Sequence, residues 1–349
     1  MKSIERFSGI SFGADPEFFF VNKKGKVVGS ERVIAKKGYS KEGSNSGKII
    51  RDGVQAEFNI RPSTCRQSFA WSLSALFKWA KERAKKKGLD ISFKQLVKVD
   101  KKELMSLSPE SRMFGCEPSY NVYEKDGMSK PVGENPEEYL FRCAGGHIHL
   151  SCSYDDSKET LKKTLQNAKE LIPIMDIVVG NTCVLMDRGR GNKERRRTYG
   201  RAGEYRQPIY GIEYRVLSNF WIRDYKLVSL VLGLCRIAVS VVRNSTKGCN
   251  YAKKLRELVK QEDIINAINK NDKKLALKNF NKIKKFLKQI LPTNYGLAFD
   301  KYRIPKFEKF IKKPITFWFK SNPLAKWTRV SGDVAAIGWE RFADGVIHK

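Results

Sequence analysis

The sequence predicts an α+β protein in which an antiparallel sheet carries packed helices on one side. Three observations predict this class. Short strand-like runs alternate with turns in the first third of the chain, long helical patterns appear further on, and the short connections between strands favour antiparallel pairing. A hydrophobic content of 41% over 349 residues allows a large core and is typical of a folded protein.

The N-terminal third contains two strand candidates and one helix. FGADPEFFFVN (12–22) is a strand candidate followed by a hairpin turn, and VQAEFNIRP (54–62) is a strand candidate closed by its proline. Apolar residues recur at helical spacing from Gln67 to Lys87, which predicts a helix. Gly88 is expected to end it.

The middle of the chain continues this mixture of strands and helices. CAGGHIHLSC (143–152) and IYGIEYRVLSNFW (209–221) are strand candidates. Residues 157–186 follow a helical pattern with a kink expected at Pro173. An apolar helix is expected from Asp224 to Arg243. Its apolar stretch is too short to span a bilayer, so no membrane partner is expected.

The charge is strongly basic and unevenly distributed. The chain contains 68 Lys and Arg against 37 Asp and Glu, a formal net charge of +31, and its composition becomes lysine-rich and helical after Gly248. We therefore expect a main domain over residues 1–247 and a basic, largely helical C-terminal region over residues 248–349 that packs on it. The charge predicts affinity for a polyanion such as nucleic acid, or for an acidic protein.

The cysteines and the N-terminus indicate where the protein works. Seven cysteines are scattered without a CxxC pair, which argues against a disulfide framework and a structural zinc site. No apolar run of signal-peptide length begins the chain. Both observations favour a cytoplasmic location.

Acidic and histidine side chains alternate along several strand candidates, so that pairs of them face one side of a sheet. Burying unpaired carboxylates is costly, and a cluster of them needs cations. Carboxylates with one imidazole suit Mg²⁺ or Mn²⁺. Each feature alone has a structural explanation, as a surface acid, a core histidine or a salt bridge. A zinc hydrolase site at the two histidines is a further alternative. The candidates are Asp15 with Glu17, Glu57, His147 with His149, and Glu213 with Arg215.

Residues 187–206 are expected to form a loop dense in arginine and glycine. Guanidinium groups bind phosphate bidentately, and glycines let the backbone approach a ligand. The alternative is a solvated basic loop that binds RNA or DNA. Other nucleotide motifs fail, because Gly43–Ile49 is one residue short of a phosphate loop and no GxGxxG follows a strand.

Four motifs occur in order between about residues 9 and 221: FGADPEF, DGVQAEFNIRP, AGGHIHLS, and YGRAGEYR with YGIEYRVLSN. In these motifs the chain resembles the phage-type amidoligases, which are carboxylate–amine ligases of the glutamine synthetase and glutamate–cysteine ligase superfamily. The resemblance implies a curved antiparallel β-sheet of glutamine-synthetase-like catalytic type, whose concave face holds ATP and divalent ions.

The resemblance also implies a role for each matching residue. Glu204 would be a further site acid without a firm match. The expected metal ligands are Asp15, Glu17, Glu57, His147 and Glu213. The expected catalytic residues are Glu17, Glu57, His147, Glu213 and Arg215. ATP or the substrate carboxylate would be bound by Arg201, Arg206, Arg215 and His149.

The implied function is an ATP- and Mg²⁺- (or Mn²⁺-) dependent ligase. It would join an amino-acid or peptide carboxylate to an amine acceptor through an acyl phosphate, in the host cytoplasm if phage-encoded. The alternative from another class is a non-catalytic, basic nucleic-acid-binding or virion-associated protein. Either kind of protein could bind a polyanion or an acidic protein through the C-terminal region.

Overall fold

A computed structural model describes residues 10–291, except for residues 43–44, 65, 116–118, 130–134, 153–157, 188, 190, 224 and 246–249. Some expected features lie outside the described residues. They are Arg188 and Arg190 of the arginine-rich segment, the expected domain boundary at residues 247 and 248, and the chain after residue 291.

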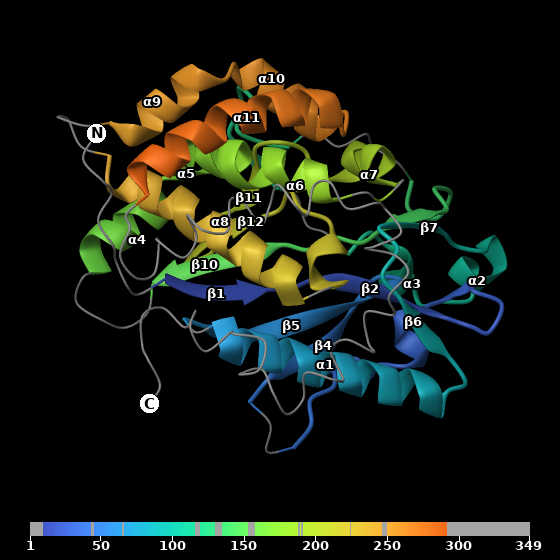
Figure 1. Ribbon diagram of the computed structural model, residues 1–349. Coiled ribbons are helices and arrows are strands. Elements are labelled where there is room, and N and C mark those ends of the chain that lie inside the picture. Colours follow the sequence, from blue (N-terminus) through green and yellow to red (C-terminus); the bar gives the residue numbers. More distant parts are fainter. Residues whose placement is uncertain are drawn as a thin grey trace.

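Ten strands of the described residues form one antiparallel sheet (Figure 1). They are β1 (Ile10–Ala14), β2 (Glu17–Val21), β3 (Val27–Val28), β4 (Gly47–Asp52), β5 (Gln55–Ser63), β6 (Asp90–Ser92), β8 (Tyr120–Asn121), β10 (Ile148–Cys152), β11 (Glu204–Arg206) and β12 (Gly211–Tyr214). The main path runs β3-β2-β5-β1-β10-β12-β11-β8, while β4 pairs with β5 and β6 with β2. A separate two-stranded sheet joins β7 (Leu96–Lys98) to β9 (Phe141–Cys143).

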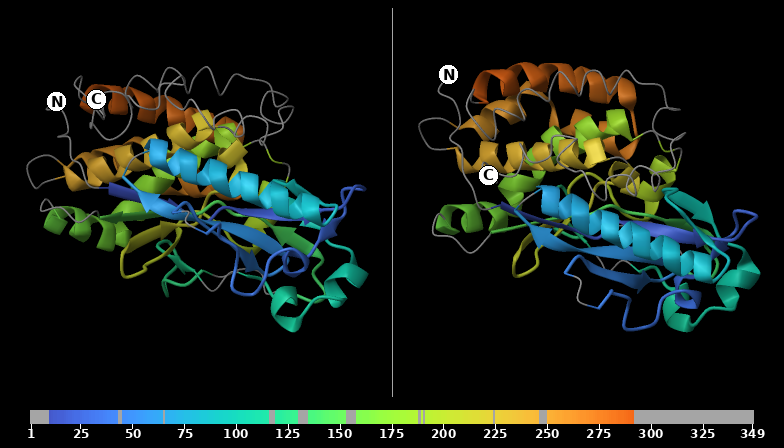
Figure 2. Two further views of the ribbon diagram at one scale, coloured as in Figure 1. Left: turned by 90° about the horizontal axis from the view of Figure 1, so that it is seen from below. Right: turned by 60° about the horizontal axis from the view of Figure 1, so that its bottom comes forward.

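One face of the sheet is apolar and is covered by helices. Phe12, Phe58 and Leu150 are fully buried on this face. Helix α1 (Arg66–Lys86) packs against β4 and β5 (Figure 2). At this contact the rings of Phe58 and Phe77 lie 5.0 Å apart. Helix α8 (Tyr225–Arg243) belongs to the same buried cluster. The alternation of aromatic and aliphatic residues along the strands therefore decides which face becomes the core.

The other face carries polar side chains. Residues that pair directly across neighbouring strands point to the same side. Gly13 pairs with His149, and His149 pairs with Glu213, across β1, β10 and β12. Two residues further along the same strands, Ser151 pairs with Ser11 and with Gly211. We call this side of the sheet the polar face.

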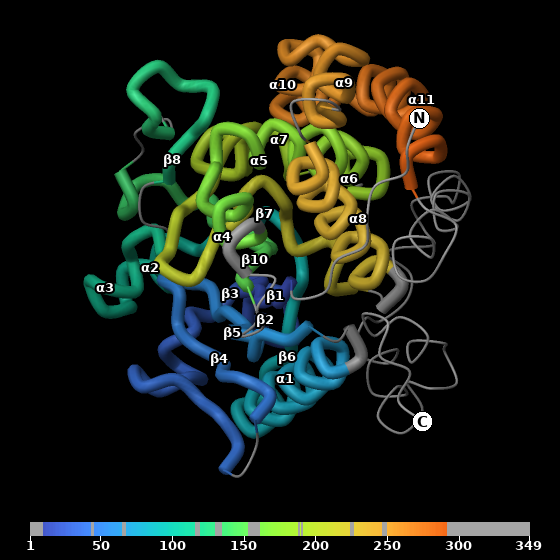
Figure 3. Tube along the Cα trace, turned by 90° about the vertical axis from the view of Figure 1, so that its left-hand side faces the viewer, coloured from blue at the N-terminus to red at the C-terminus, as the bar shows by residue number. Residues whose placement is uncertain are grey.

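Further helices form two layers beyond the sheet. Next to α8 lie α5 (Ala168–Met175), the π-helix η2 (Asp176–Gly180) and α6 (Asn181–Met186). Helices α9 (Tyr251–Leu258), α10 (Gln261–Asn269) and α11 (Lys273–Ile290) form the outer layer against α5 and α6 (Figures 1 and 3). The remaining helices are η1 (Ser30–Arg32), α2 (Lys101–Met105), α3 (Pro109–Arg112), α4 (Lys158–Gln166), α7 (Asn192–Thr198) and η3 (Asn219–Arg223).

Hydrogen bonds join the two helical layers. The Asn181 side chain donates to the Ala276 carbonyl at 3.1 Å, and Asn279 donates to the Asn181 side-chain oxygen at 3.1 Å. Apolar residues of the sheet and of both layers form one buried cluster. The division into residues 1–247 and 248–349 stays a prediction. No helix among the described residues is long and apolar enough to cross a membrane.

The predicted α+β class with an antiparallel sheet is confirmed, whereas the curvature of the sheet stays a prediction. Four predicted elements are wrong in their extent. The strand candidate at 12–22 is interrupted at Asp15 and Pro16, between β1 and β2. The strand candidate at 209–221 is a strand only over β12, and its end belongs to η3. The strand candidate at 143–152 starts only at Ile148, because Cys143 ends β9 in the other sheet. The helix expected over 157–186 is interrupted at Asn167, whose side chain accepts a hydrogen bond from the Glu170 N–H and caps α5.

The expectation that residues 187–206 form a loop is also wrong in part, because they include α7. Arg195 is fully buried, and its Nη2 donates to the Val216 carbonyl at 2.6 Å. Arg196 is buried as well, and burial lowers its pKa to about 9. These two arginines therefore contribute to the fold and are not part of a solvated basic loop.

Candidate active site

Three carboxylates meet on the polar face where β2, β4 and β5 lie side by side. Glu17 of β2 pairs directly with Glu57 of β5, and Asp52 ends β4 at the turn into β5. One oxygen of each carboxylate lies within 4.8 Å of the other two. We call these three residues the carboxylate cluster. Its donors are all oxygens, which is the ligand type that Mg²⁺ and Mn²⁺ prefer.

The carboxylate cluster is electrostatically unfavourable without a cation. Burial and then repulsion from neighbouring acids raise the pKa of Asp52 and of Glu57 well above the usual range. Asp52 Oδ2 is buried and accepts no hydrogen bond from any described residue. A divalent cation bound between the carboxylates would remove the repulsion and coordinate this oxygen.

Glu17 is held in a fixed orientation by the surrounding chain. Its Oε2 accepts hydrogen bonds from the Gly145 N–H and the Tyr199 hydroxyl, both at 2.9 Å. The Gln55 side chain approaches the same oxygen at 3.4 Å. These donors come from three separate segments, so the carboxylate is oriented by the tertiary fold.

A second group combines two carboxylates with an imidazole. Asp15, immediately after β1, His149 of β10 and Glu213 of β12 each offer one ligand atom within 4.8 Å of the others. His149 Nε2 lies 2.9 Å from Asp15 Oδ2. We call these three residues the mixed cluster. It is built from the strands β1, β10 and β12, which are adjacent in the sheet.

His147 lies beside the mixed cluster. Its Nδ1 is 3.2 Å from Asp15 Oδ1 and 3.5 Å from Glu213 Oε1. Its Nε2 is buried and makes no hydrogen bond to any described residue. The structure thus brings both predicted histidines to the same two acids, with His149 in the three-residue cluster and His147 next to it.

The charges of the mixed cluster largely compensate one another. Burial alone would raise the pKa of Asp15, but His149 and His147 outweigh it and hold this pKa well below its usual range. Burial alone would lower the pKa of His149, but the Asp15 carboxylate outweighs it and raises this pKa. The mixed cluster therefore pairs its acids with basic groups, unlike the carboxylate cluster.

Two of the three predicted arginines reach the mixed cluster. Arg215 is fully buried, and its Nη1 donates to Glu213 Oε1 at 2.5 Å. Arg206 Nη1 lies 3.8 Å from Glu213 Oε2. Arg201 is engaged elsewhere, since its Nε donates to the Arg196 carbonyl at 3.1 Å. The polar face therefore combines acids with guanidinium groups that can face phosphate.

Glu204 has a structural role. Its carboxylate accepts hydrogen bonds from the Ser129 hydroxyl and the Gly200 N–H, both at 2.5 Å. It is fully buried and joins the segment before β11 to the chain near β8. The expectation of a further site acid is not supported by these contacts.

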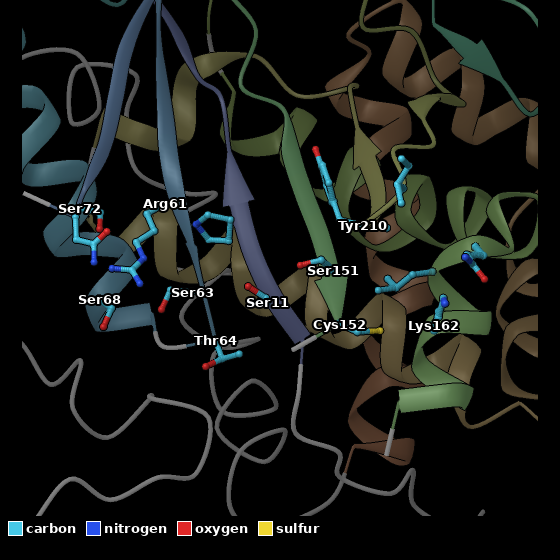
Figure 4. Close-up of a pocket in the computed structure, with 16 residues that line it drawn as sticks. Ser11, Arg61, Ser63, Thr64, Ser68, Ser72, Ser151, Cys152, Lys162 and Tyr210 are labelled. Carbon is cyan, nitrogen blue, oxygen red and sulfur yellow. The ribbon is translucent and has the colours of Figure 1, made fainter. Parts of the chain in front are cut away.

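A cavity of about 1010 Å³ opens on the polar face next to the mixed cluster (Figure 4). Its floor includes Ser11, Ser151 and Gly211. Each of them lies on β1, β10 or β12, two residues from the position where that strand reaches the mixed cluster. Arg61 and Lys162 stand on opposite sides of it (Figure 4). No carboxylate lines the cavity within the described residues, so its chemistry suits an anionic, polar ligand.

Three functional candidates escaped sequence reasoning. Asp52 enters the site because the turn at Gly53 and Val54 brings the end of β4 beside Glu57. Tyr199 and Tyr210 contact Glu17 and His149 from other parts of the chain. Only Asp52 had a readable signal, because an Asp-Gly pair between two strand-like runs predicts a hairpin turn.

A buried carboxylate also supports β12 from behind. Asp176 of η2 accepts hydrogen bonds from the Tyr214 hydroxyl at 2.6 Å and the Gly203 N–H at 2.7 Å. Burial raises the pKa of Asp176 to about 7. Tyr214 lies between Glu213 and Arg215 in sequence, so this contact fixes the strand that carries both.

An antiparallel sheet whose polar face combines two acid clusters, arginines and a large cavity is consistent with a metal-dependent transfer enzyme. Residues 133–298 match the family model described as phage phiEco32-like COOH.NH2 ligase-type 2. This segment is a little under half of the chain, and its match supports the resemblance to phage-type carboxylate–amine ligases that the motifs predicted. The match contains the mixed-cluster residues His149 and Glu213 but none of the carboxylate cluster.

No curated protein is similar to the chain in sequence. Among solved structures, "Apo GmaS without ligand" is 14% identical with a TM-score of 0.38, over 90% of this chain and 72% of that one. A bifunctional glutathione synthetase from Pasteurella multocida is 10% identical with a TM-score of 0.47, over 96% of this chain and 50% of its own. TM-scores this low establish neither a shared fold nor shared residue roles.

Proposed function

We propose that the protein is an ATP-dependent ligase that uses Mg²⁺ or Mn²⁺ to join a carboxylate to an amine. The observation that carries this proposal is the pair of acid clusters on one face of the sheet, beside arginines and a cavity suited to an anion. The match of residues 133–298 to a carboxylate–amine ligase family model supports the reaction class. An amino-acid or peptide carboxylate and an amine acceptor would be the substrates.

The residues present fit divalent metals. The carboxylate cluster offers only oxygen donors, and Asp52 Oδ2 accepts no hydrogen bond from the described residues. The mixed cluster would add His149 to Asp15 and Glu213, a donor set that suits Mn²⁺ as well as Mg²⁺. Metals held by these residues would supply positive charge that offsets the negative charge of phosphoryl transfer.

The cavity is the proposed binding site for the nucleotide. Its hydroxyl groups, Arg61 and Lys162 provide donors for a polar anion. It adjoins the mixed cluster at Tyr210, which lines the cavity and contacts His149. A nucleotide lying in the cavity would therefore direct its terminal phosphates toward the acid clusters.

The arginines would act on the charge that develops during transfer. Arg206 and Arg215 face the mixed cluster and would stabilise negative charge on the transferred phosphoryl group. Tyr199 and Gly145 fix Glu17, so that the carboxylate cluster is organised before substrate binds. The protein would thus contribute positioning and electrostatics, and no protein nucleophile is needed.

The proposed reaction has two steps. A carboxylate oxygen of the first substrate attacks the γ-phosphorus, forming an acyl phosphate while the bond from phosphorus to the ADP oxygen breaks. The amine nitrogen then attacks the acyl carbon, the bond from carbon to the phosphate oxygen breaks, and the nitrogen loses a proton. The products are an amide, ADP and inorganic phosphate.

The test is ADP release by the full-length protein with Mg²⁺, screened over amino acids and polyamines as carboxylate and amine donors. We expect ADP release that requires both substrates. Glu213→Gln is expected to abolish turnover while circular dichroism stays unchanged, and Glu170→Gln, in an ion pair with Arg256, is the matched control. Failure to bind ATP with either Mg²⁺ or Mn²⁺ would refute the proposal.

We propose in addition that the outer helical layer binds a polyanion. Helix α11 contains many lysines and no acidic residue. Lys274, Lys278, Lys282 and Lys285 are exposed at spacings of three or four, which places them along one side of the helix. Duplex DNA binding that weakens with salt and with charge reversal at Lys278 and Lys282 would support this role. Binding unchanged by the reversal would exclude this helix as the contact.

A further inference from the structure

One tyrosine connects the cavity to the mixed cluster. Tyr210 lies in the short connection between β11 and β12 and is 52% exposed. Its hydroxyl is 2.5 Å from His149 Nδ1, and the two rings are stacked with centroids 5.8 Å apart at 22°. In Figure 4 the ring stands beside β10 with its hydroxyl pointing away from Ser151. Tyr210 thus contacts the imidazole from the cavity side.

This contact determines which ring nitrogen of His149 faces the acids. With Nδ1 bonded to Tyr210, Nε2 is the nitrogen that lies 2.9 Å from Asp15 Oδ2. Imidazole ligands of metals characteristically donate their second N–H to an acceptor, which fixes the tautomer and the ring orientation. The Tyr210 hydroxyl is such an acceptor for an Nδ1–H, and this tautomer leaves the Nε2 lone pair for a metal.

A hydroxyl is well suited to this position. When Nε2 binds a metal, the neutral ring carries its proton on Nδ1, and the hydroxyl oxygen accepts a hydrogen bond from that N–H. The stacked ring restricts rotation of the imidazole at the same time.

The neighbouring histidine lacks an equivalent contact. His147 directs Nδ1 toward Asp15 and Glu213, while its buried Nε2 makes no hydrogen bond to any described residue. Its ring meets that of Tyr199 edge to face, at a centroid distance of 5.7 Å and an angle of 72°. Only His149 therefore has an oriented imidazole with an outer hydrogen-bond partner among the described residues.

We propose that Tyr210 is a positioning residue that makes His149, through Nε2, the imidazole ligand of the mixed cluster. This inference rests on the proposed function, because it presumes that the acid clusters bind divalent metal. Since the same side chain lines the cavity, the orientation of His149 and the shape of the cavity wall depend on one residue.

The test is Mn²⁺ binding to the full-length protein, measured by calorimetry and by electron paramagnetic resonance without nucleotide. Glu57→Gln removes a ligand of the carboxylate cluster, so the Mn²⁺ that remains bound reports the mixed cluster. Adding Tyr210→Phe in this background keeps the stacked ring and removes only the hydroxyl. We expect affinity to fall about 10-fold or more, the usual cost of losing such a partner.

The matched control is Tyr120→Phe, which changes another half-exposed tyrosine, packed against Tyr205 at the sheet edge. It should leave Mn²⁺ affinity unchanged. Imidazole ¹⁵N spectra with Mg²⁺ provide a second readout, because the chain has only three histidines and single replacements assign them. The His149 signals should show a protonated Nδ1 in the wild type and a mixture of tautomers in Tyr210→Phe.

The possible results separate the two proposals. Equal Mn²⁺ affinity and equal ¹⁵N spectra for Tyr210→Phe and its parent would overturn the positioning role and leave the proposed function intact. Absence of Mn²⁺ binding by the wild-type protein would overturn the proposed function and this inference with it.

Discussion

The two acid clusters differ in how their charge is balanced. The carboxylate cluster contains three acids and no base, and burial with mutual repulsion raises the pKa of Asp52 and Glu57. The mixed cluster contains an imidazole and adjoins Arg215, and the pKa of Asp15 is lowered. At Asp52, burial and repulsion outweigh the nearby Arg215 and Arg206, whereas at Asp15 the two histidines outweigh burial. This difference predicts different responses to metal and to substitution.

The largest expected effect is on activity and metal stoichiometry. Glu57→Gln removes an oxygen ligand from the carboxylate cluster, which contains no basic residue. The Mn²⁺ bound at this cluster should therefore be lost, and the number of Mn²⁺ ions per protein should fall. Ligase activity should fall on the order of 100-fold or more. Calorimetry and ADP release measure the two effects. An unchanged stoichiometry would mean that the carboxylate cluster does not bind the metal.

A second effect concerns stability without metal and has opposite signs in the two clusters. Asp52→Asn removes repulsion and should raise the free energy of unfolding, whereas Asp15→Asn removes the partner of two histidines and should lower it. Each change should be on the order of 1–2 kcal/mol. Urea unfolding in the presence of a chelator provides the measurement. Changes of the same sign would contradict the contrast between the clusters.

A third effect depends on pH and tests the support behind the mixed cluster. Burial raises the pKa of Asp176 from 3.8 to about 7, so the folded state keeps a proton that the unfolded state releases within this window. The contribution of Asp176 to stability should therefore fall as the pH rises from about 4 to about 7 and then level off. Asp176→Asn cannot titrate and serves as the reference. Parallel unfolding free energies of both proteins over this range would refute the assignment.

Parts of the site were predictable because they follow from local alternation. The same-face pairs His147 with His149 and Glu213 with Arg215 depend only on the two-residue period of a strand, and the structure brings them together. The roles proposed for these residues remain predictions. Asp52 could have been anticipated from its hairpin, but its position beside Glu57 depends on the register of β4 against β5.

Other parts depend on tertiary contacts that one sequence does not reveal. Tyr210 and Tyr199 reach the clusters from a loop and from the end of a short helix. The arginine-rich segment misled the prediction, because its composition suits a solvated loop while Arg195 is buried under β12 and its following residues. Burial of arginine is decided by available carbonyl partners, and these lie far away in sequence.

The pairing of β1, β10 and β12 links correct strand register to formation of the mixed cluster. A slip of one residue in β10 would turn His149 toward the aromatic core and Leu150 toward water. The hydrogen-bond register that excludes water from the core is therefore also the register that assembles the mixed cluster. A misfolded molecule with this slip would lose stability together with the proposed metal affinity, so the amount of metal bound in a preparation would report its fraction of correctly paired chains.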